Sequence, residues 1–147
     1  MKRIHSAVDE DLAFLASMEA QIFSDPWSEE ALRATNNQPH GHILVSEDEG
    51  GLLGYAVVYY VADEGEIARI AVQPSRRQEG IGRSLLDAIC EEGKKRGATR
   101  VLLDVRESNG TARTFYETYG FRQDGIRPNF YQSPKEHAIL MSFPIEE

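Results

Sequence analysis

The chain is poor in cysteine and contains no long apolar run. Its 147 residues include a single cysteine, Cys90, which excludes an internal disulfide bond and a cysteine metal cluster. His5, His40 and His42 form no recognisable ligand set, so we expect no metal site. No apolar stretch has the length of a signal peptide or of a membrane span, which predicts a cytoplasmic protein that does not engage a membrane.

The charge balance is acidic. The formal net charge is −8 at pH 7, with 41% hydrophobic and 27% charged residues, which is typical of a soluble globular protein. A net negative field repels nucleic acid and anionic membranes, and it attracts a basic partner weakly. The length suits one domain with a sizeable core, so we expect a single domain over residues 1–147.

Hydrophobic periodicity predicts an α/β protein with the order strand, two helices, three strands, helix, strand, helix and two strands. A strand–helix–strand unit over 66–105 implies local parallel pairing, and the hairpins around it imply antiparallel pairing. We expect Asp9 to cap the first helix, and the nearly all-apolar RVLLDV (100–105) to form a strand buried on both faces. The remaining helices are expected from 28, over 82–96 and over 109–119, and the remaining strands over 42–47, 52–61, 66–72, 121–131 and 137–143.

The stretch RRQEGIGRSLL (76–86) joins arginines and glycines at the start of a predicted helix. Backbone N–H groups at a helix start are unpaired and carry partial positive charge, and Gly80 and Gly82 leave them open to a ligand. Arg76, Arg77 and Arg83 can pair with phosphate oxygens. The plainer alternative is a glycine turn with solvated arginines, but three arginines in an acidic chain favour a bound anion.

Two familiar phosphate-binding motifs do not fit this stretch. The chain has no GxxxxGK followed by Ser or Thr, which a P-loop requires. The dinucleotide fingerprint GxGxxG is closer, but Leu85 occupies its third glycine position. Residues 73–79 also separate the strand from Gly80, whereas that fingerprint needs an immediate turn.

The stretch VQPSRRQEGIGRSLL resembles the acyl-CoA-binding motif of the GNAT acetyltransferase superfamily. DPWSEEAL, EIARIAV, LLDVRESNGTARTFYETYGF, RPNFY and EHAILM resemble successive motifs of the ribosomal-protein-alanine N-acetyltransferases, bacterial enzymes that acetylate the N-terminal alanine of a small-subunit ribosomal protein. The resemblance covers the whole chain. It implies the GNAT fold: a mixed, mostly antiparallel sheet with a central splayed pair of parallel strands and helices on both faces.

The resemblance also implies how acetyl-CoA, the co-substrate, is held. The backbone of the strand that ends at Val72 pairs with the pantetheine arm, and the glycine loop holds the pyrophosphate. Asn109 touches the pantetheine region, although from the residues alone it is equally a helix N-cap. The implied acetyl-CoA residues are Ile70, Ala71, Val72, Arg77, Gln78, Glu79, Gly80, Ile81, Gly82, Arg83 and Asn109.

Acetyl transfer needs a neutral amine and a proton for the departing thiolate. At pH 7, deprotonating an α-amine with a pKa of about 7.7–8.0 costs roughly 1 kcal/mol, against roughly 4.6 kcal/mol for a lysine with a pKa of about 10.4. The resemblance places the catalytic carboxylate at Asp104 and the proton donor at Tyr116, which by periodicity alone would be a core aromatic. Many family members carry Glu at the position of Asp104. The shorter side chain therefore suggests a water relay, with Glu66 as the rival base.

The resemblance assigns substrate contacts to Tyr131, Glu66 and Trp27, although Trp27 alone would be interpreted as packing. The expected partner is a protein N-terminus, one from a basic ribosomal protein. Two alternatives remain: a GNAT enzyme for a small-molecule amine or a lysine, and a CoA-binding module without turnover.

Overall fold

The computed structural model describes residues 1–132 and 134–145. Within these residues the predicted order of elements is confirmed, with two short 3₁₀ helices added at Asp9–Asp11 and Pro74–Arg76. The helices are α1 (Leu12–Ile22), α2 (Glu29–Asn36), α3 (Ile81–Lys95) and α4 (Gly110–Tyr119). The strands are β1 (Arg3–Ser6), β2 (Gly41–Asp48), β3 (Gly51–Val61), β4 (Glu64–Val72), β5 (Arg100–Arg106), β6 (Arg122–Gln132) and β7 (Lys135–Pro144).

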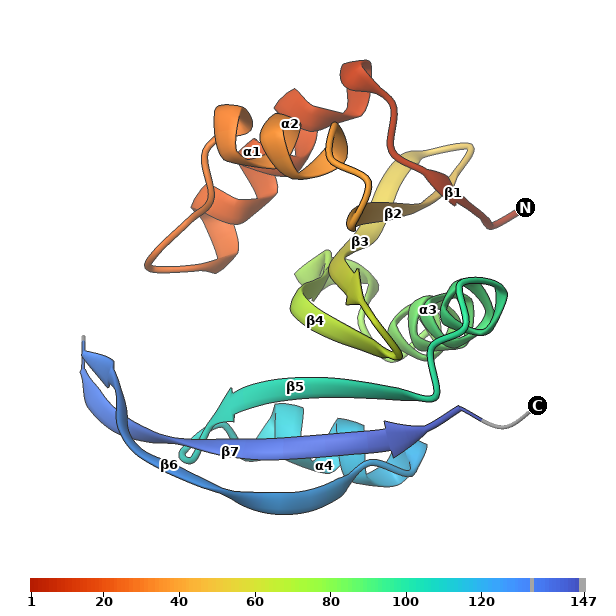
Figure 1. Cartoon of the computed structure of the whole chain (residues 1–147). Coiled ribbons are helices and arrows are strands. Elements are labelled where there is room, and N and C mark those ends of the chain that lie inside the picture. Colours follow the sequence, from red (N-terminus) through yellow and green to blue (C-terminus); the bar gives the residue numbers. More distant parts are fainter. Residues whose placement is uncertain (133, 146–147) are drawn as a thin grey trace.

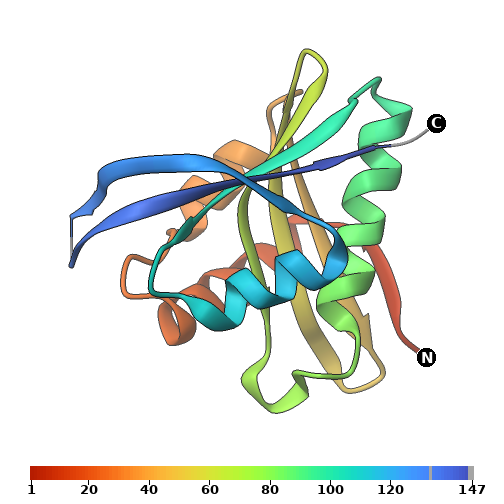
Figure 2. The same ribbon diagram turned by 90° about the horizontal axis from the view of Figure 1, so that it is seen from below.

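The strands form one mixed sheet with the order β1-β2-β3-β4-β5-β7-β6 (Figure 1). The β4–β5 pair is parallel and every other neighbouring pair is antiparallel. Helices α1 and α2 cover one face of the sheet, and α3 and α4 cover the other, as Figure 2 shows for the latter pair. The predicted α/β fold with helices on both faces is therefore confirmed. No helix in the described part of the chain is long and apolar enough to cross a bilayer.

The sheet separates two hydrophobic cores. On one face, Leu85, Leu86 and Ile89 of α3 pack with Tyr116 of α4 and with side chains from β3, β4, β5 and β7. On the other face, apolar residues of α1 and α2 form the second core. The strands that contribute buried side chains to it are β2, β3 and β4. The second core therefore stops at β4, and the α1–α2 side of β5 has no helix above it.

A β-bulge in β4 separates the two halves of the sheet. Val57 of β3 pairs with Arg69 and Val58 pairs with Ile67, so Ala68 is the extra residue. Parallel pairing of β4 with β5 runs from Glu64↔Arg100 to Ile67↔Leu103 and ends directly before the bulge. A bulge bends its strand and ends regular pairing. The rest of β4 and β5 therefore diverge, which Figure 1 shows towards the left of the view, and the predicted splayed pair is present.

Two local predictions were wrong. Strand β5 is not buried on both faces, because Val101, Leu103 and Val105 are buried while Arg100 and Asp104 are exposed. The reason is the one-sided helix cover of this strand. Asp9 does not cap the first helix: the turn begins as a 3₁₀ helix, and Asp11 Oδ2 accepts the Val8 N–H at 3.0 Å.

Substitution of Gly54 should test how tightly β3 supports β4. A Cβ atom at Gly54 would lie 2.6 Å from the backbone oxygen of Ala71, so Gly54→Ala should destabilise the fold by about 1–3 kcal/mol. Gly110→Ala is the matched control, because nothing lies within 4 Å of the added atom. Urea unfolding should show a lower midpoint for Gly54→Ala alone, and equal midpoints for the two variants would contradict this account of the packing.

Candidate functional site

The divergence of β4 from β5 leaves peptide groups of β4 without a strand partner. The Gln73 N–H donates to Leu53 O of the β3 side at 2.8 Å, and the Ala71 carbonyl also faces β3. Because peptide groups alternate along a strand, those of Ile70 and Val72 point the other way, into the space between β4 and β5. Arg77 Nε makes a long contact of 3.4 Å with Val72 O. An extended ligand can add to this edge through backbone hydrogen bonds.

The loop after β4 leads into an uncapped helix start. Gln78 and Gly80 have positive φ angles of 67° and 81°, and Gly80 is the N-cap of α3 without a side chain to cap it. The Ser84 N–H reaches Gly80 O at 3.0 Å, so the amides before it, from Ile81 to Arg83, precede the helical ladder. In contrast, the α4 start is closed by Asn109 Oδ1, which accepts the Ala112 N–H at 3.1 Å. The α3 start is thus open, and an uncapped helix start of this kind can accept an anion.

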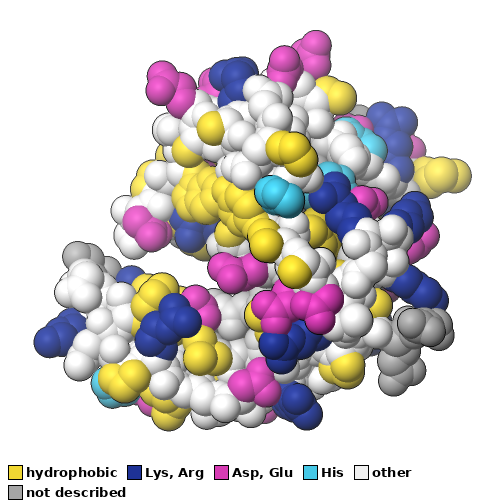
Figure 3. Space-filling view, in the orientation of Figure 1, with side chains coloured by type: hydrophobic (Ala, Val, Ile, Leu, Met, Phe, Trp, Pro, Cys, Tyr) yellow, Lys and Arg dark blue, Asp and Glu magenta, His cyan; other side chains and the backbone are white. Residues whose placement is uncertain are grey.

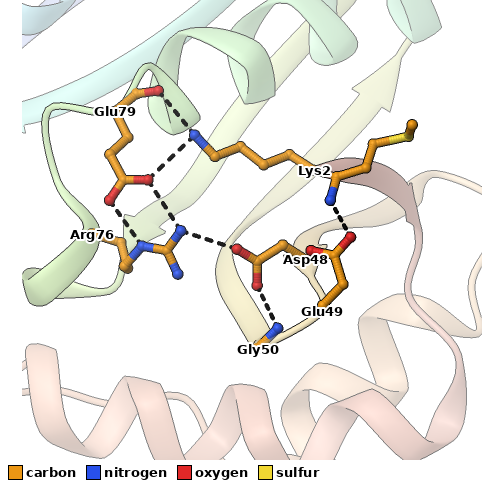
Figure 4. A network of polar contacts seen from close by, with 7 residues as sticks. Lys2, Asp48, Glu49, Gly50, Arg76 and Glu79 are labelled. Carbon is orange, nitrogen blue, oxygen red and sulfur yellow. Dashed lines mark hydrogen bonds and ion pairs between the residues drawn. The ribbon is translucent and has the colours of Figure 1, made fainter.

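The arginines of the loop have different roles. Figure 4 shows the Arg76 guanidinium between Glu79 and Asp48, at 2.8 and 3.0 Å, and Lys2 beside Glu79 at 3.3 Å. Arg76 therefore binds the loop to the β2–β3 turn, which corrects the expectation that it faces an anion. Arg77 and Arg83 are exposed.

The two glycines of the motif also differ. Gly80 needs its left-handed backbone, and the space around it is open. A Cβ atom at Gly82 would lie 2.9 Å from Phe115 Cζ of α4. Gly82 therefore serves the close packing of α3 against α4 as well as any ligand, and a substitution there would disturb both.

Tyr116 is largely buried in α4. Its ring packs against Phe115 and Phe121 at centroid distances of 5.2 and 5.4 Å. Burial raises the pKa of its hydroxyl, and the nearby Tyr131 adds to the effect. The phenol therefore stays protonated at neutral pH, as a proton donor must, while its ring forms part of the core.

Asp104 projects from the face of β5 that has no helix cover. Its carboxylate lies 4.0 Å from Arg127 Nη1 of β6, and its side chain is 30% exposed, so water reaches it. The pKa of Tyr131 is raised first by burial and then by the charge of Asp104. Tyr131 is thus within electrostatic reach of both Asp104 and Tyr116.

Glu66 lies beside Asp104 at the point of divergence. It pairs in register with Leu102 of β5, two residues before Asp104, and with Tyr59 of β3. Register partners share a face, so Glu66 and Asp104 lie on the same face of neighbouring strands. Both are exposed, and the structure leaves both carboxylates open to an amine.

The other predicted contacts line the flanks of this region. The Arg106 guanidinium stacks 4.3 Å above the Tyr131 ring and pairs with Glu136 at 3.2 Å. Trp27 is part-buried against the core formed with α1 and α2, and it lines an open hollow of about 600 Å³ with Tyr59, to which no other predicted site residue contributes. Figure 3 shows the surface hollowed on the left, between the part that carries α1 and α2 and the part that carries β5, β6 and β7.

The sequence analysis missed a buried charged cluster of Glu19, Arg69 and Tyr55. Glu19 is fully buried and pairs with Arg69 at 3.0 Å, and its carboxylate accepts a short hydrogen bond from the Tyr55 hydroxyl. The position of Glu19 in the sequence could have revealed this cluster, because Glu19 follows Leu12 and Leu15 at helical spacing on the core face of α1. No described group of three or more His, Cys, Asp or Glu residues could hold a metal ion.

Comparison with known proteins identifies the class of this protein. The model of the acetyltransferase (GNAT) family matches residues 12–121. The chain is 34% identical to a putative [ribosomal protein bS18]-alanine N-acetyltransferase of Bacillus subtilis, covering 94% of this chain and 92% of that protein. It is 33% identical to the Escherichia coli K12 [ribosomal protein bS18]-alanine N-acetyltransferase, covering 99% of both chains.

Solved structures show the same fold. The crystal structure of the ribosomal-protein-S18-alanine N-acetyltransferase from Escherichia coli aligns with a TM-score of 0.89 at 32% identity, over 100% of this chain and 96% of that one. Arabidopsis thaliana NAA60 with a bisubstrate analogue aligns with a TM-score of 0.90 at 17% identity, over 99% of each chain. The chain therefore belongs to the GNAT family and is an acetyltransferase. Enzymes of this family use acetyl-CoA as the acetyl donor.

Replacing Arg76 with Gln should raise the pKa values of Asp48 and Glu79 towards their ordinary range. The hydrogen bonds from Arg76 are the largest cause that lowers the pKa of each carboxyl, so its loss removes the charge that favours the ionised forms. Because both pKa values are lowered in the folded protein, the ion pairs hold at neutral pH and are lost as the pH falls through the lowered values.

NMR titration of the two carboxyl groups would measure this change. Arg33→Gln is the control, because Arg33 pairs with Glu29 on α2 at 2.9 Å, away from the loop. Unaltered titration of Asp48 and Glu79 in the Arg76 variant would show that another group anchors the loop.

Proposed function

We propose that the protein transfers the acetyl group of acetyl-CoA to the N-terminal α-amine of a protein, an alanine-initiated ribosomal protein. The observation that carries this proposal is similarity over nearly the whole chain, at 33–34% identity, to enzymes named for that reaction. A cytoplasmic location follows, since ribosomal proteins are made and assembled there. The net charge of −8 suits a basic partner.

The cleft between β4 and β5 would hold acetyl-CoA. The peptide groups of Ile70 and Val72 face this cleft and would pair with the pantetheine arm, while Ala71 lies between them with its peptide group towards β3. The amides from Ile81 to Arg83 at the start of α3, with exposed Arg77 and Arg83, would hold the pyrophosphate.

The remaining loop residues would fix the conformation of the loop. Gln78 and Gly80 supply the positive φ angles that turn the chain towards the phosphates. Glu79 holds Arg76 and Lys2 and so fixes the loop. Asn109 would support the pantetheine region from its place as the cap of α4.

The acceptor amine would enter from the open face of β5. Bound acetyl-CoA supplies an activated carbonyl and a thiolate leaving group. Asp104, open to water, would take the proton of the ammonium through a water molecule, which leaves the amine free to attack. Tyr116, whose hydroxyl remains protonated, would give its proton to the departing thiolate. Glu66 and Tyr131 would hold the N-terminal residue, with Trp27 on the flank.

Tyr116→Phe tests the proton donor. The change keeps the ring and removes the hydroxyl, so turnover should fall by roughly 10²–10⁴ while the melting temperature and acetyl-CoA affinity change little. Tyr119→Phe on the same helix is the matched control, because its hydroxyl donates to Asp87 of α3 at 2.6 Å and is not assigned to the reaction. Turnover is measured in a steady-state assay. Normal turnover of both variants would show that Tyr116 serves only in packing.

A comparison of Asp104→Asn with Glu66→Gln tests the base and the acceptor together. Each variant is assayed with acetyl-CoA and either an Ala-initiated peptide or a lysine peptide blocked at its N-terminus. If Asp104 is the base, its loss should slow the reaction most at low pH. Raising the pH should recover part of the rate, because more α-amine is then already neutral.

The same assays distinguish the alternatives. If only Glu66→Gln slows the reaction, Glu66 is the base and Asp104 is the residue that holds the substrate. Preferential acetylation of the blocked lysine peptide by the unaltered enzyme would overturn the N-terminal assignment. Binding of acetyl-CoA without turnover of either peptide would point to a binding module or to another amine.

A further inference from the structure

A buried ion pair, Glu19–Arg69, lies beneath the loop that joins α1 to α2. The Glu19 carboxylate of α1 is fully buried and accepts hydrogen bonds from Arg69 Nη2 at 3.0 Å and from Arg69 Nε at 3.1 Å. It also accepts the backbone N–H of Trp27 at 2.8 Å and the Tyr55 hydroxyl. A buried charge is costly unless it is paired and hydrogen-bonded, and this one is satisfied from three separate segments.

Arg69 links this carboxylate to β4. It follows the bulge residue Ala68 and precedes Ile70, whose peptide group faces the cleft. Its side chain is 14% exposed and lies with its guanidinium 3.8 Å from the centroid of the Phe23 ring. Arg69 Nη2 also donates to the Asp25 carbonyl oxygen at 2.8 Å.

The pair therefore holds the loop between α1 and α2 at two backbone points. These are the carbonyl of Asp25 and the amide of Trp27, within residues 24–27, which lie between the end of α1 and the Ser28 cap of α2. The loop flanks the acceptor region: Asp25 contributes to the raised pKa of Tyr131, and Trp27 lines the cavity beside Tyr59.

We propose that the Glu19–Arg69 pair is a positioning device that sets the loop 24–27 for the acceptor peptide and fixes it to the strand segment that receives acetyl-CoA. This inference rests on the proposed function. Neither side chain touches the reacting atoms. An arginine is required because its planar fork can bind a carboxylate and a carbonyl together, whereas a lysine ammonium offers one point of charge.

Arg69→Lys is the principal test, and Arg33→Lys is its matched control on an exposed pair with Glu29. We expect Arg69→Lys to raise the KM for the Ala-initiated peptide by roughly tenfold, the equivalent of one lost contact. The KM for acetyl-CoA should stay within about threefold and kcat should change little, because the cleft peptide groups remain. Arg33→Lys should leave all three constants unchanged.

The loop carries its own spectroscopic reporter, because Trp27 is the single tryptophan of the chain. Arg69→Lys and Glu19→Gln should shift its fluorescence to longer wavelength and increase quenching by acrylamide, since the loop is no longer held. Tyr55→Phe removes a Glu19 contact that does not involve the loop and should leave the emission unchanged. In the unaltered protein, the Trp27 amide should be protected from hydrogen exchange.

These readouts separate the possible outcomes. Unchanged Trp27 emission with unchanged peptide KM overturns the inference, and so does an equal rise of both KM values. A lowered melting temperature without a selective effect on the peptide would make the pair merely structural. If a variant fails to fold, rapid exchange of the Trp27 amide in the unaltered protein overturns the inference. If the unaltered enzyme ignores the Ala-initiated peptide, the proposed function fails, while the fluorescence still decides the positioning role.

Discussion

The extra residue Ala68 in β4 is the constraint on which the rest of the structure depends. It ends the pairing of β4 with β5 after Ile67↔Leu103, although both strands continue. A sheet normally satisfies the backbone groups of its central strands internally, and here those of Ile70 and Val72 have no strand partner on the β5 side. The same bulge directs Arg69 towards α1, so the shape of the cleft and the support beneath its flank have a common origin.

The loop after β4 shows how an acidic protein keeps a local positive site. Carboxylates of the protein take up one guanidinium, that of Arg76, and so fix the loop against the β2–β3 turn. The uncapped amides of α3 and the exposed Arg77 and Arg83 keep positive charge at the surface, where the proposed pyrophosphate site lies. Arg76 thus makes the loop rigid. A pre-formed loop needs less ordering when a ligand binds.

Much of the fold was predictable because its signals are local. Periodicity gave the order of the elements, and the glycine–arginine pattern located the helix start. Apart from the cap of the first helix, the errors concern contacts between distant segments. The apolar composition of β5 suggested burial on both faces, but whether a helix covers its second face depends on where α1 and α2 pack. The partners of Arg76 and the Glu19–Arg69 pair, which joins residues fifty positions apart, could not be seen from spacing. That Glu66 and Asp104 lie on one face could be seen only from the register of β4 and β5.

The contact between Gly82 and Phe115 has a mechanical consequence. The strands on either side of the cleft, β1–β4 and β5–β7, are joined by four register pairs between β4 and β5. Helix α3 packs behind the first group and α4 behind the second, and they meet where Gly82 leaves room for the ring. The two groups of strands are therefore joined twice, by the short β4–β5 ladder within the sheet and by the contact of α3 with α4 behind it. Any side chain larger than that of glycine at position 82 would meet the Phe115 ring, so the packing of the two helices behind the sheet depends on the small volume of this one residue.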